Sequence, residues 1–173
     1  MPTKRHPDRQ LHLIDAENLG QDPRPTALAA SAVRATYNQL VGRQACDHVV
    51  VACNHGALLN VGCAWLGARL LARSGKDGAD LALLDVLATE DVASRYDGVV
   101  LGSGDGIFTD AVIELRRSGL DVTVVAPLES LSRRLRMVAS RVVSFADLSP
   151  EGPPAASALV ASFGLSDDLG RAA

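Results

Sequence analysis

Short apolar runs alternate with longer, partly polar segments along most of the chain. Six runs have the length of a buried strand: 11–15, 47–53, 68–73, 97–103, 120–127 and 141–145. Between them lie five segments with helix-like patterns: 25–40, 56–68, 78–90, 106–119 and 130–140. Apolar strands separated by helices are typical of a parallel sheet that is covered on both faces. The pattern predicts an α/β domain with a mainly parallel sheet.

The same pattern sets the expected limits of this domain. Residues 1–10, MPTKRHPDRQ, are polar, and after Leu148 the composition shifts to Pro, Ala, Gly and Ser. We expect a polar N-terminal extension over 1–10, one domain over 11–148, and a flexible tail over 149–173.

Composition narrows the class of protein. The chain is 47% hydrophobic, enough for a real core, but it has no apolar run of about 18 residues and no signal-peptide pattern, which favours a cytoplasmic protein without membrane contact. Cys46, Cys53 and Cys63 lie in or beside apolar segments without C-x-x-C spacing, so we expect buried thiols rather than disulfides or zinc ligands. A net charge of −3 argues against nucleic-acid binding through bulk charge alone.

Three aspartates fall at functionally informative places in this pattern. In doubly wound sheets, ligands bind at the carboxyl ends of the strands, where the strand order reverses. Asp15 ends the first strand, Asp105 follows the fourth within GSGDG, and Asp80 begins the helix between the third and fourth strands. If the strand order is 3-2-1-4-5, the three carboxylates converge at the switch point.

Such a cluster predicts a bound cation, because uncompensated carboxylates repel each other and take up protons. Oxygen ligands without His or Cys favour Mg²⁺ or Mn²⁺ over zinc. A hard cation also leaves positions for a phosphate and an activated water, as in phosphodiester cleavage. The backbone N–H groups of the glycine-rich turn and the start of helix 106–119 could hold that phosphate.

Four segments together resemble the signature blocks of NYN domains, the PIN-like branch of metal-dependent ribonucleases: LIDAENL (13–19), GADLALLD (78–85), GSGDGIF (102–108) and SLSRRLRMVASRVVSF (130–145). The resemblance covers residues 11–148. It implies a PIN-like Rossmannoid three-layer sandwich, a divalent ion, and an endoribonuclease that cleaves RNA with a metal-activated water. By motif position, Asp15, Asp80 and Asp105 correspond to the metal-binding acids, and Asn18 to the residue that positions the phosphate or the water.

The chain departs from the family pattern at one position. Family members often read S-G-D-x-D-F in the fourth-strand block, and Ile107 replaces the second aspartate here. Asp110, one turn later, is a candidate substitute ligand. Asp85 lies about 140° around an ideal helix from Asp80, so we expect it to support the site at most.

Further candidate residues concern binding of an RNA partner. Ser103 and three arginines of the last helix, Arg133, Arg134 and Arg136, are expected to contact single-stranded or structured RNA. With only six aromatic residues, sequence-specific reading by base stacking is not favoured. Exposed sheet edges and the arginine-rich helix also suggest a homodimer.

Other interpretations remain open at this point. Asp15, Asp80 and Asp105 each stand where a turn or N-cap carboxylate is common, and the three arginines could form a solvated helix face. Loss of an acid at Ile107 would suit a catalytically weakened NYN-fold module that binds RNA or protein. A phosphatase with an aspartyl phosphate is disfavoured, because the turn after the first strand reads D-A-E rather than D-x-D.

Overall fold

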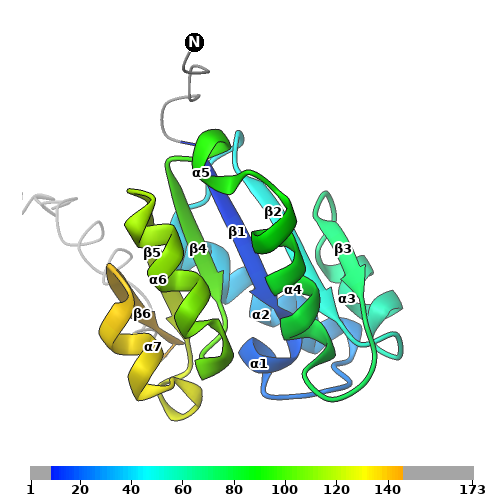
Figure 1. Cartoon of the computed structure of the whole chain (residues 1–173). Helices are drawn as coiled ribbons and strands as arrows, with labels where there is room; N and C mark the ends of the chain where they lie inside the picture. Colours follow the sequence, from blue (N-terminus) through cyan, green and yellow to red (C-terminus); the bar gives the residue numbers. More distant parts are fainter. Residues whose placement is uncertain (1–8, 146–173) are drawn as a thin grey trace, which may run out of the picture.

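The central feature is a six-stranded sheet in which all strands are parallel (Figure 1). The computed structural model describes residues 9–145. In sheet order the strands are β3 (Arg69–Ala72), β2 (His48–Cys53), β1 (Gln10–Asp15), β4 (Gly98–Gly102), β5 (Asp121–Ala126) and β6 (Arg141–Ser144). The expected order 3-2-1-4-5 is confirmed, and β6 extends the sheet as an edge strand beyond β5.

The strand order reverses at β1. From β1 the chain proceeds outward to β2 and β3, and then crosses back to β4 on the other side of β1. The carboxyl ends of β1 and β4 are therefore neighbours, as the predicted site requires.

Helices cover both faces of the sheet and make a three-layer sandwich (Figure 1). One face carries α1 (Ala16–Gly20), α2 (Ala27–Val41) and α3 (Leu58–Ala64). The other carries α4 (Gly78–Thr89), α5 (Val92–Arg95), α6 (Thr109–Arg117) and α7 (Arg133–Val138). Two 3-10 turns, η1 (Gly106–Phe108) and η2 (Leu128–Ser130), precede α6 and α7.

Strand alternation decides which side chains face which layer. Leu11 and Leu13 of β1 pack into the core beneath α4 and α6, whereas Ile14 packs beneath α1 and α2. Because side chains alternate with a period of two, Asp15 falls on the same side as Leu13, the side of α4. The alternation thus directs Asp15 toward the layer that contains Asp80.

Several predicted helices differ in extent from the observed ones. The short helices α1 and α5 were not predicted, because four or five residues carry too little periodicity. The predicted helix 130–140 shortens to α7, since Leu131 and Ser132 are extended and the Ser132 N–H donates to the Gly104 carbonyl at 2.8 Å. Contacts with a distant loop, which no local pattern reveals, set this boundary.

The expectation of three buried thiols is wrong for two of them. Cys53 is buried in β2, but Cys46 lies exposed in the loop before β2, and Cys63 lies exposed on α3. Apolar neighbours in sequence do not bury a side chain that points away from the sheet. No helix within 9–145 is long and apolar enough to cross a membrane. The predicted tail and nearly all of the N-terminal extension lie outside the described residues.

Candidate metal centre

Asp15 is held at the carboxyl end of β1 by its own following turn. One oxygen, Oδ1, accepts hydrogen bonds from the Glu17 and Asn18 N–H groups at 2.9 and 3.0 Å, which caps α1. The side chain is buried at the switch point. Asp15 is therefore the N-cap of α1, and the capping hydrogen bonds use only one of its two carboxylate oxygens.

Asp80 reaches the same place from the first turn of α4. The helix begins at Gly78, directly after Asp77, whose backbone is left-handed. A Cβ at Gly78 would lie 2.3 Å from the Arg73 carbonyl oxygen. Only glycine fits that close approach without a shift of the backbone. This tight turn places the Asp80 side chain, which is 7% exposed, against the end of β1.

The carboxyl groups of Asp15 and Asp80 approach each other within hydrogen-bonding reach, where two negative charges repel and a hydrogen bond through a shared proton is favoured. Burial, the charge of Asp15, that hydrogen bond and the charges of Asp105 and Asp77 raise the pKa of Asp80 to about 8. Burial also raises the pKa of Asp15, against the opposing effect of its hydrogen bonds. These effects favour the protonated form of Asp80 near neutral pH.

Asp105 is the half-buried N-cap of η1, and its Oδ1 accepts from the Ile107 N–H at 2.9 Å. Its charge raises the pKa of both Asp15 and Asp80. Within 9–145, however, no three His, Cys, Asp or Glu side chains lie close enough together to hold a metal ion. The structure thus brings two of the three predicted acids into contact and leaves the third nearby.

The acid pair nevertheless fits a hard cation. The Asp80 Oδ1 atom is buried and has no hydrogen-bond partner, a costly state for a carboxyl oxygen. Magnesium keeps several waters and takes only one or two carboxylates from the protein, so Asp15 and Asp80 suffice as direct ligands. Asp105 can act through one of those waters. A divalent ion would replace the shared proton and satisfy the orphaned oxygen.

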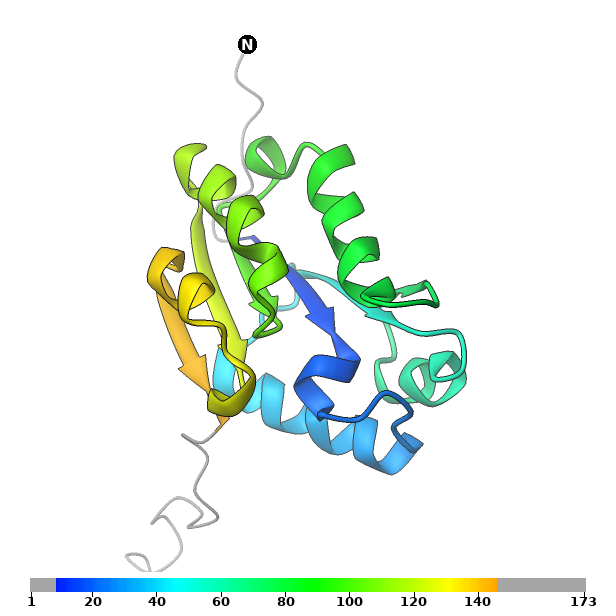
Figure 2. The same cartoon turned by 60° about the horizontal axis from the view of Figure 1, so that its bottom comes forward.

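Gly104 ties three separate segments together beside the pair. Its N–H donates to Asn18 Oδ1 at 2.9 Å, and its carbonyl accepts from the Ser132 N–H. A Cβ at this position would lie 2.4 Å from the Ser130 carbonyl oxygen, so the approach again requires glycine. Figure 2 shows α1, η1 and the segment leading into α7 grouped at this edge of the sheet. Asn18 thus orients the loop that carries Asp105.

Three other predicted residues are exposed or form hydrogen bonds with groups other than the pair. Asp85 is exposed and forms an ion pair with Arg73 at 2.9 Å, so it does not support the pair. Asp110 is exposed on α6 and does not fill the position that Ile107 leaves without an acid. Ser103 is fully buried, and its Oγ accepts a hydrogen bond from the Asp105 N–H at 3.3 Å, so its hydroxyl supports the loop.

The predicted arginines lie on α7, which follows directly from the segment bound to Gly104. Arg133, Arg134 and Arg136 are exposed, and none forms an ion pair with another described residue. Their charges are therefore available to an anionic partner that extends from the edge of the sheet.

Sequence reasoning missed the structural roles of Glu17 and Gly104. Glu17 accepts a hydrogen bond from the Asn54 N–H and so connects the turn after β1 to the end of β2. The glycine-rich turn was noticed, but for the backbone N–H groups that it could offer to a phosphate. The requirement at Gly104 is instead a close contact with a segment 26 residues further along the chain.

The fold and the acidic edge define a class of protein: a PIN-like α/β fold of the nuclease-like type. The family model described as NYN domain matches residues 13–148, and the chain belongs to the NYN domain family. No curated protein matches the chain. A crystal structure of a protein of unknown function, VPA0982 from Vibrio parahaemolyticus RIMD 2210633, is similar with a TM-score of 0.56 and 21% identity, over 82% of this chain and 95% of that one. At this identity, the similarity concerns the fold alone.

Proposed function

We propose that the chain is a divalent-metal-dependent endoribonuclease that hydrolyses RNA phosphodiester bonds. The observation that carries the proposal is the buried pair of Asp15 and Asp80, with an orphaned oxygen on Asp80, at the switch point of an NYN domain. A buried acid pair with no counter-charge destabilises the fold unless a ligand uses it. An acid whose pKa is strongly shifted by burial and a specific charged neighbour is a candidate for a functional site.

Each residue of the edge has a proposed task. Asp15 and Asp80 hold Mg²⁺ or Mn²⁺ directly, and Asp105 orients a coordinated water. When bound, the ion neutralises the carboxylates, polarises the scissile phosphate and supplies an activated water. The Asn18 amide nitrogen makes no hydrogen bond to another described residue, so it is free to donate to a phosphate oxygen.

RNA is the proposed substrate because the family is RNA-related and because of α7. Arg133, Arg134 and Arg136 offer three unpaired charges on a helix that continues from the Gly104 contact. Phosphates on either side of the scissile bond would meet these charges. Glutamate substitutions at Arg133 and Arg134 should weaken RNA binding and lower its salt dependence. The control is Arg43, an exposed arginine in the loop after α2, where substitution by glutamate should have a smaller effect on both properties.

The decisive experiment compares two carboxylate variants. Labelled single-stranded and hairpin RNA is incubated with wild type, Asp15→Asn or Asp85→Asn, in Mg²⁺, Mn²⁺ or EDTA. Asp85 is a matched control because it is an acid on the same layer that pairs with Arg73 at the surface. We expect EDTA to abolish cleavage and Asp15→Asn to reduce it by about 100-fold or more, with Asp85→Asn close to wild type. Cleavage in EDTA, or equal loss in both variants, contradicts the proposal.

A second candidate function rests on Ile107. This apolar side chain is 36% exposed beside Asp105, and only two acids are in contact, as in a weakened site that binds RNA without cutting it. Ile107→Asp distinguishes the two. If wild type binds RNA without cleaving it and Ile107→Asp gains cleavage, the chain is a binding module with a lost ligand. If wild type already cleaves, the isoleucine is compatible with catalysis.

A further inference from the structure

Two separate groups of cations lie at the carboxyl edge of the sheet, one on each side of the acid pair. The arginines of α7, the helix that connects β5 to β6, form one group. The other group is what we call the β3-side flank: Arg24, in the loop between α1 and α2, and Lys76, in the loop between β3 and α4. Figure 1 and Figure 2 both show α7 and the start of α4 on opposite sides of α1.

Arg24 is held beside the end of β2. The Pro23 carbonyl accepts a hydrogen bond from Asn54 Nδ2 at 2.6 Å, and the Arg24 N–H donates to Asp22 Oδ1 at 2.8 Å. These two bonds fix the loop through its backbone. The guanidinium of Arg24 is exposed and forms no ion pair within residues 9–145, so its charge is available to an anion from outside.

Lys76 lies in the turn that positions Asp80. The Gly78 N–H donates to the Gly75 carbonyl at 3.2 Å, which closes this turn. The Lys76 side chain is exposed and pairs with no acid in the described part of the chain. The charge of its neighbour Asp77 raises the pKa of Asp80, so that acid adds to the negative charge of the acid pair.

The strand order sets the order of charges along this edge. Lys76 follows β3, Arg24 lies at the end of β2, Asp15 ends β1, and α7 follows β5. The acid pair therefore lies between two positive groups. Neighbouring strands are about 4.8 Å apart, so the distance from the end of β3 to the end of β5 is about 19 Å. A single phosphate cannot meet both groups, whereas a strand with several phosphates can.

We propose that the β3-side flank is a second phosphate-binding site, so that one extended RNA strand crosses the acid pair from α7 to Arg24 and Lys76. The proposal rests on the proposed function, because it takes RNA as the ligand. Contacts on both sides of the acid pair hold an internal phosphodiester at the metal site, whereas a mononucleotide reaches only one flank. These contacts recognise charge and carry no base sequence.

Lysine labelling tests this path, because the chain has only one other lysine, Lys4, which precedes the amino end of β1. Sulfo-NHS-acetate acetylates exposed amines, and mass spectrometry follows each lysine separately. Wild type and Asp80→Asn are labelled in EDTA, with and without a single-stranded RNA of about 16 nucleotides. We expect RNA to slow the acetylation of Lys76 several-fold and that of Lys4 much less. An unchanged rate at Lys76 in both proteins overturns the proposal.

The salt dependence of RNA binding counts the contacts. For single strands, each neutralised phosphate contributes about 0.7 to the slope of log affinity against log salt concentration. Replacement of both Arg24 and Lys76 by glutamine should therefore lower this slope by about 1.4. The matched control replaces Arg43 and Arg141, two exposed arginines near the amino ends of β2 and β6, and removes the same charge. Equal changes of slope in the two double variants overturn the proposal.

The second site and the nuclease activity fail in different ways. Wild type that does not cleave RNA in Mg²⁺ or Mn²⁺, but in which RNA protects Lys76, refutes the nuclease and supports the second site. Wild type that cleaves RNA while Lys76 stays unprotected supports the nuclease and refutes the second site.

Discussion

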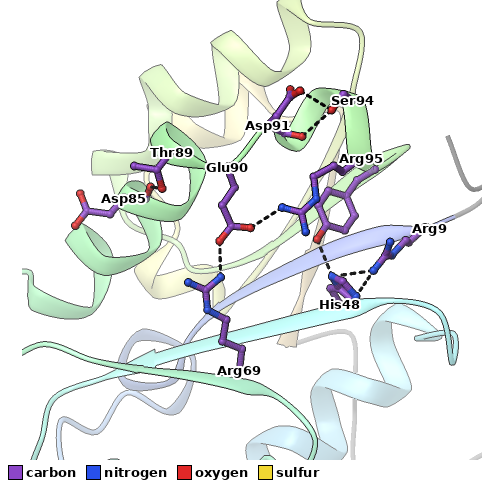
Figure 3. A network of polar contacts seen from close by, with 10 residues as sticks. Arg9, His48, Arg69, Asp85, Thr89, Glu90, Asp91, Ser94 and Arg95 are labelled. Carbon is purple, nitrogen blue, oxygen red and sulfur yellow. Dashed lines mark hydrogen bonds and ion pairs between the residues drawn. The ribbon is translucent and has the colours of Figure 1, made fainter. Parts of the chain in front are cut away.

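The two ends of the parallel sheet treat charge in opposite ways. At the amino ends of the strands, Glu90 bridges Arg69 and Arg95, and the His48 ring forms hydrogen bonds with Arg9 and with the Tyr96 hydroxyl (Figure 3). At the carboxyl ends, Asp15 and Asp80 meet, and neither forms an ion pair with a Lys, Arg or His side chain within residues 9–145. One end has its charges paired by the chain itself, and the other does not.

The pKa values at the two ends differ in the way that separates a structural network of paired charges from a candidate functional site. Pairing at the amino end lowers the pKa of Glu90, chiefly through its hydrogen bond from Arg69, so its charged form is favoured in the folded protein. At the carboxyl end the pKa of Asp80 rises to about 8, so its charged form is disfavoured. Substitutions at the two ends should therefore have opposite effects on stability, and only those at the carboxyl end should lower activity.

Asp80→Asn should produce the largest effect and should separate the two properties. We expect RNA cleavage to fall by about 100-fold or more, because a direct ligand is lost. In EDTA near pH 9, the free energy of unfolding should rise, because a buried charge next to Asp15 is removed. Cleavage assays and urea denaturation measure the two effects. A variant that loses both stability and activity would indicate a purely structural Asp80.

Gly104→Ala should damage the acidic edge without changing any charge. The added Cβ would lie 2.4 Å from the Ser130 carbonyl oxygen, so the loop that carries Asp105 must move. We expect a loss of roughly 1–3 kcal/mol in the free energy of unfolding. Gly42→Ala is no equivalent test, because Gly42 has a positive φ with open space around it. Gly20→Ala, where the nearest atom is at 3.6 Å, is the better control, and equal costs at Gly20 and Gly104 would contradict the contact.

The metal-free protein should become less stable as the pH rises. The unfolded chain releases the Asp80 proton near the usual pKa of 3.8, whereas the folded chain keeps it until about 8. Between these values the unfolded state binds fewer protons, so the Asp80 contribution falls by at most about 1.4 kcal/mol per pH unit. Urea denaturation in EDTA from about pH 5 to about pH 8 tests this, with Asp80→Asn as reference. Identical slopes for both proteins would refute it.

Glu90→Gln should have the smallest effect and should affect the opposite end. The substitution leaves Arg69 and Arg95 without their carboxylate, and all three side chains are partly exposed. We expect a loss of about 0.5–1 kcal/mol in the free energy of unfolding and no change in RNA cleavage. Reduced cleavage with unchanged stability would show that the amino end also serves the substrate.

Much of the fold was predictable because its strands are buried on both faces. Runs such as VVVAC within β2 and GVVLG over β4 are apolar without interruption, which identified the strands and their parallel arrangement. The boundaries of α7 and the positions of Cys46 and Cys63 were not predictable. They depend on contacts or directions that a local pattern does not contain.

The sequence by itself determined that acids stand at the ends of β1 and β4 and at the start of α4, because strand ends and helix starts follow from periodicity. Only the tertiary structure decided that Asp15 and Asp80 touch while Asp105 stays apart and Asp85 turns to Arg73. The physical reason is that contact depends on the close approaches at Gly78 and Gly104. Both bring together backbone segments whose partners the sequence does not specify.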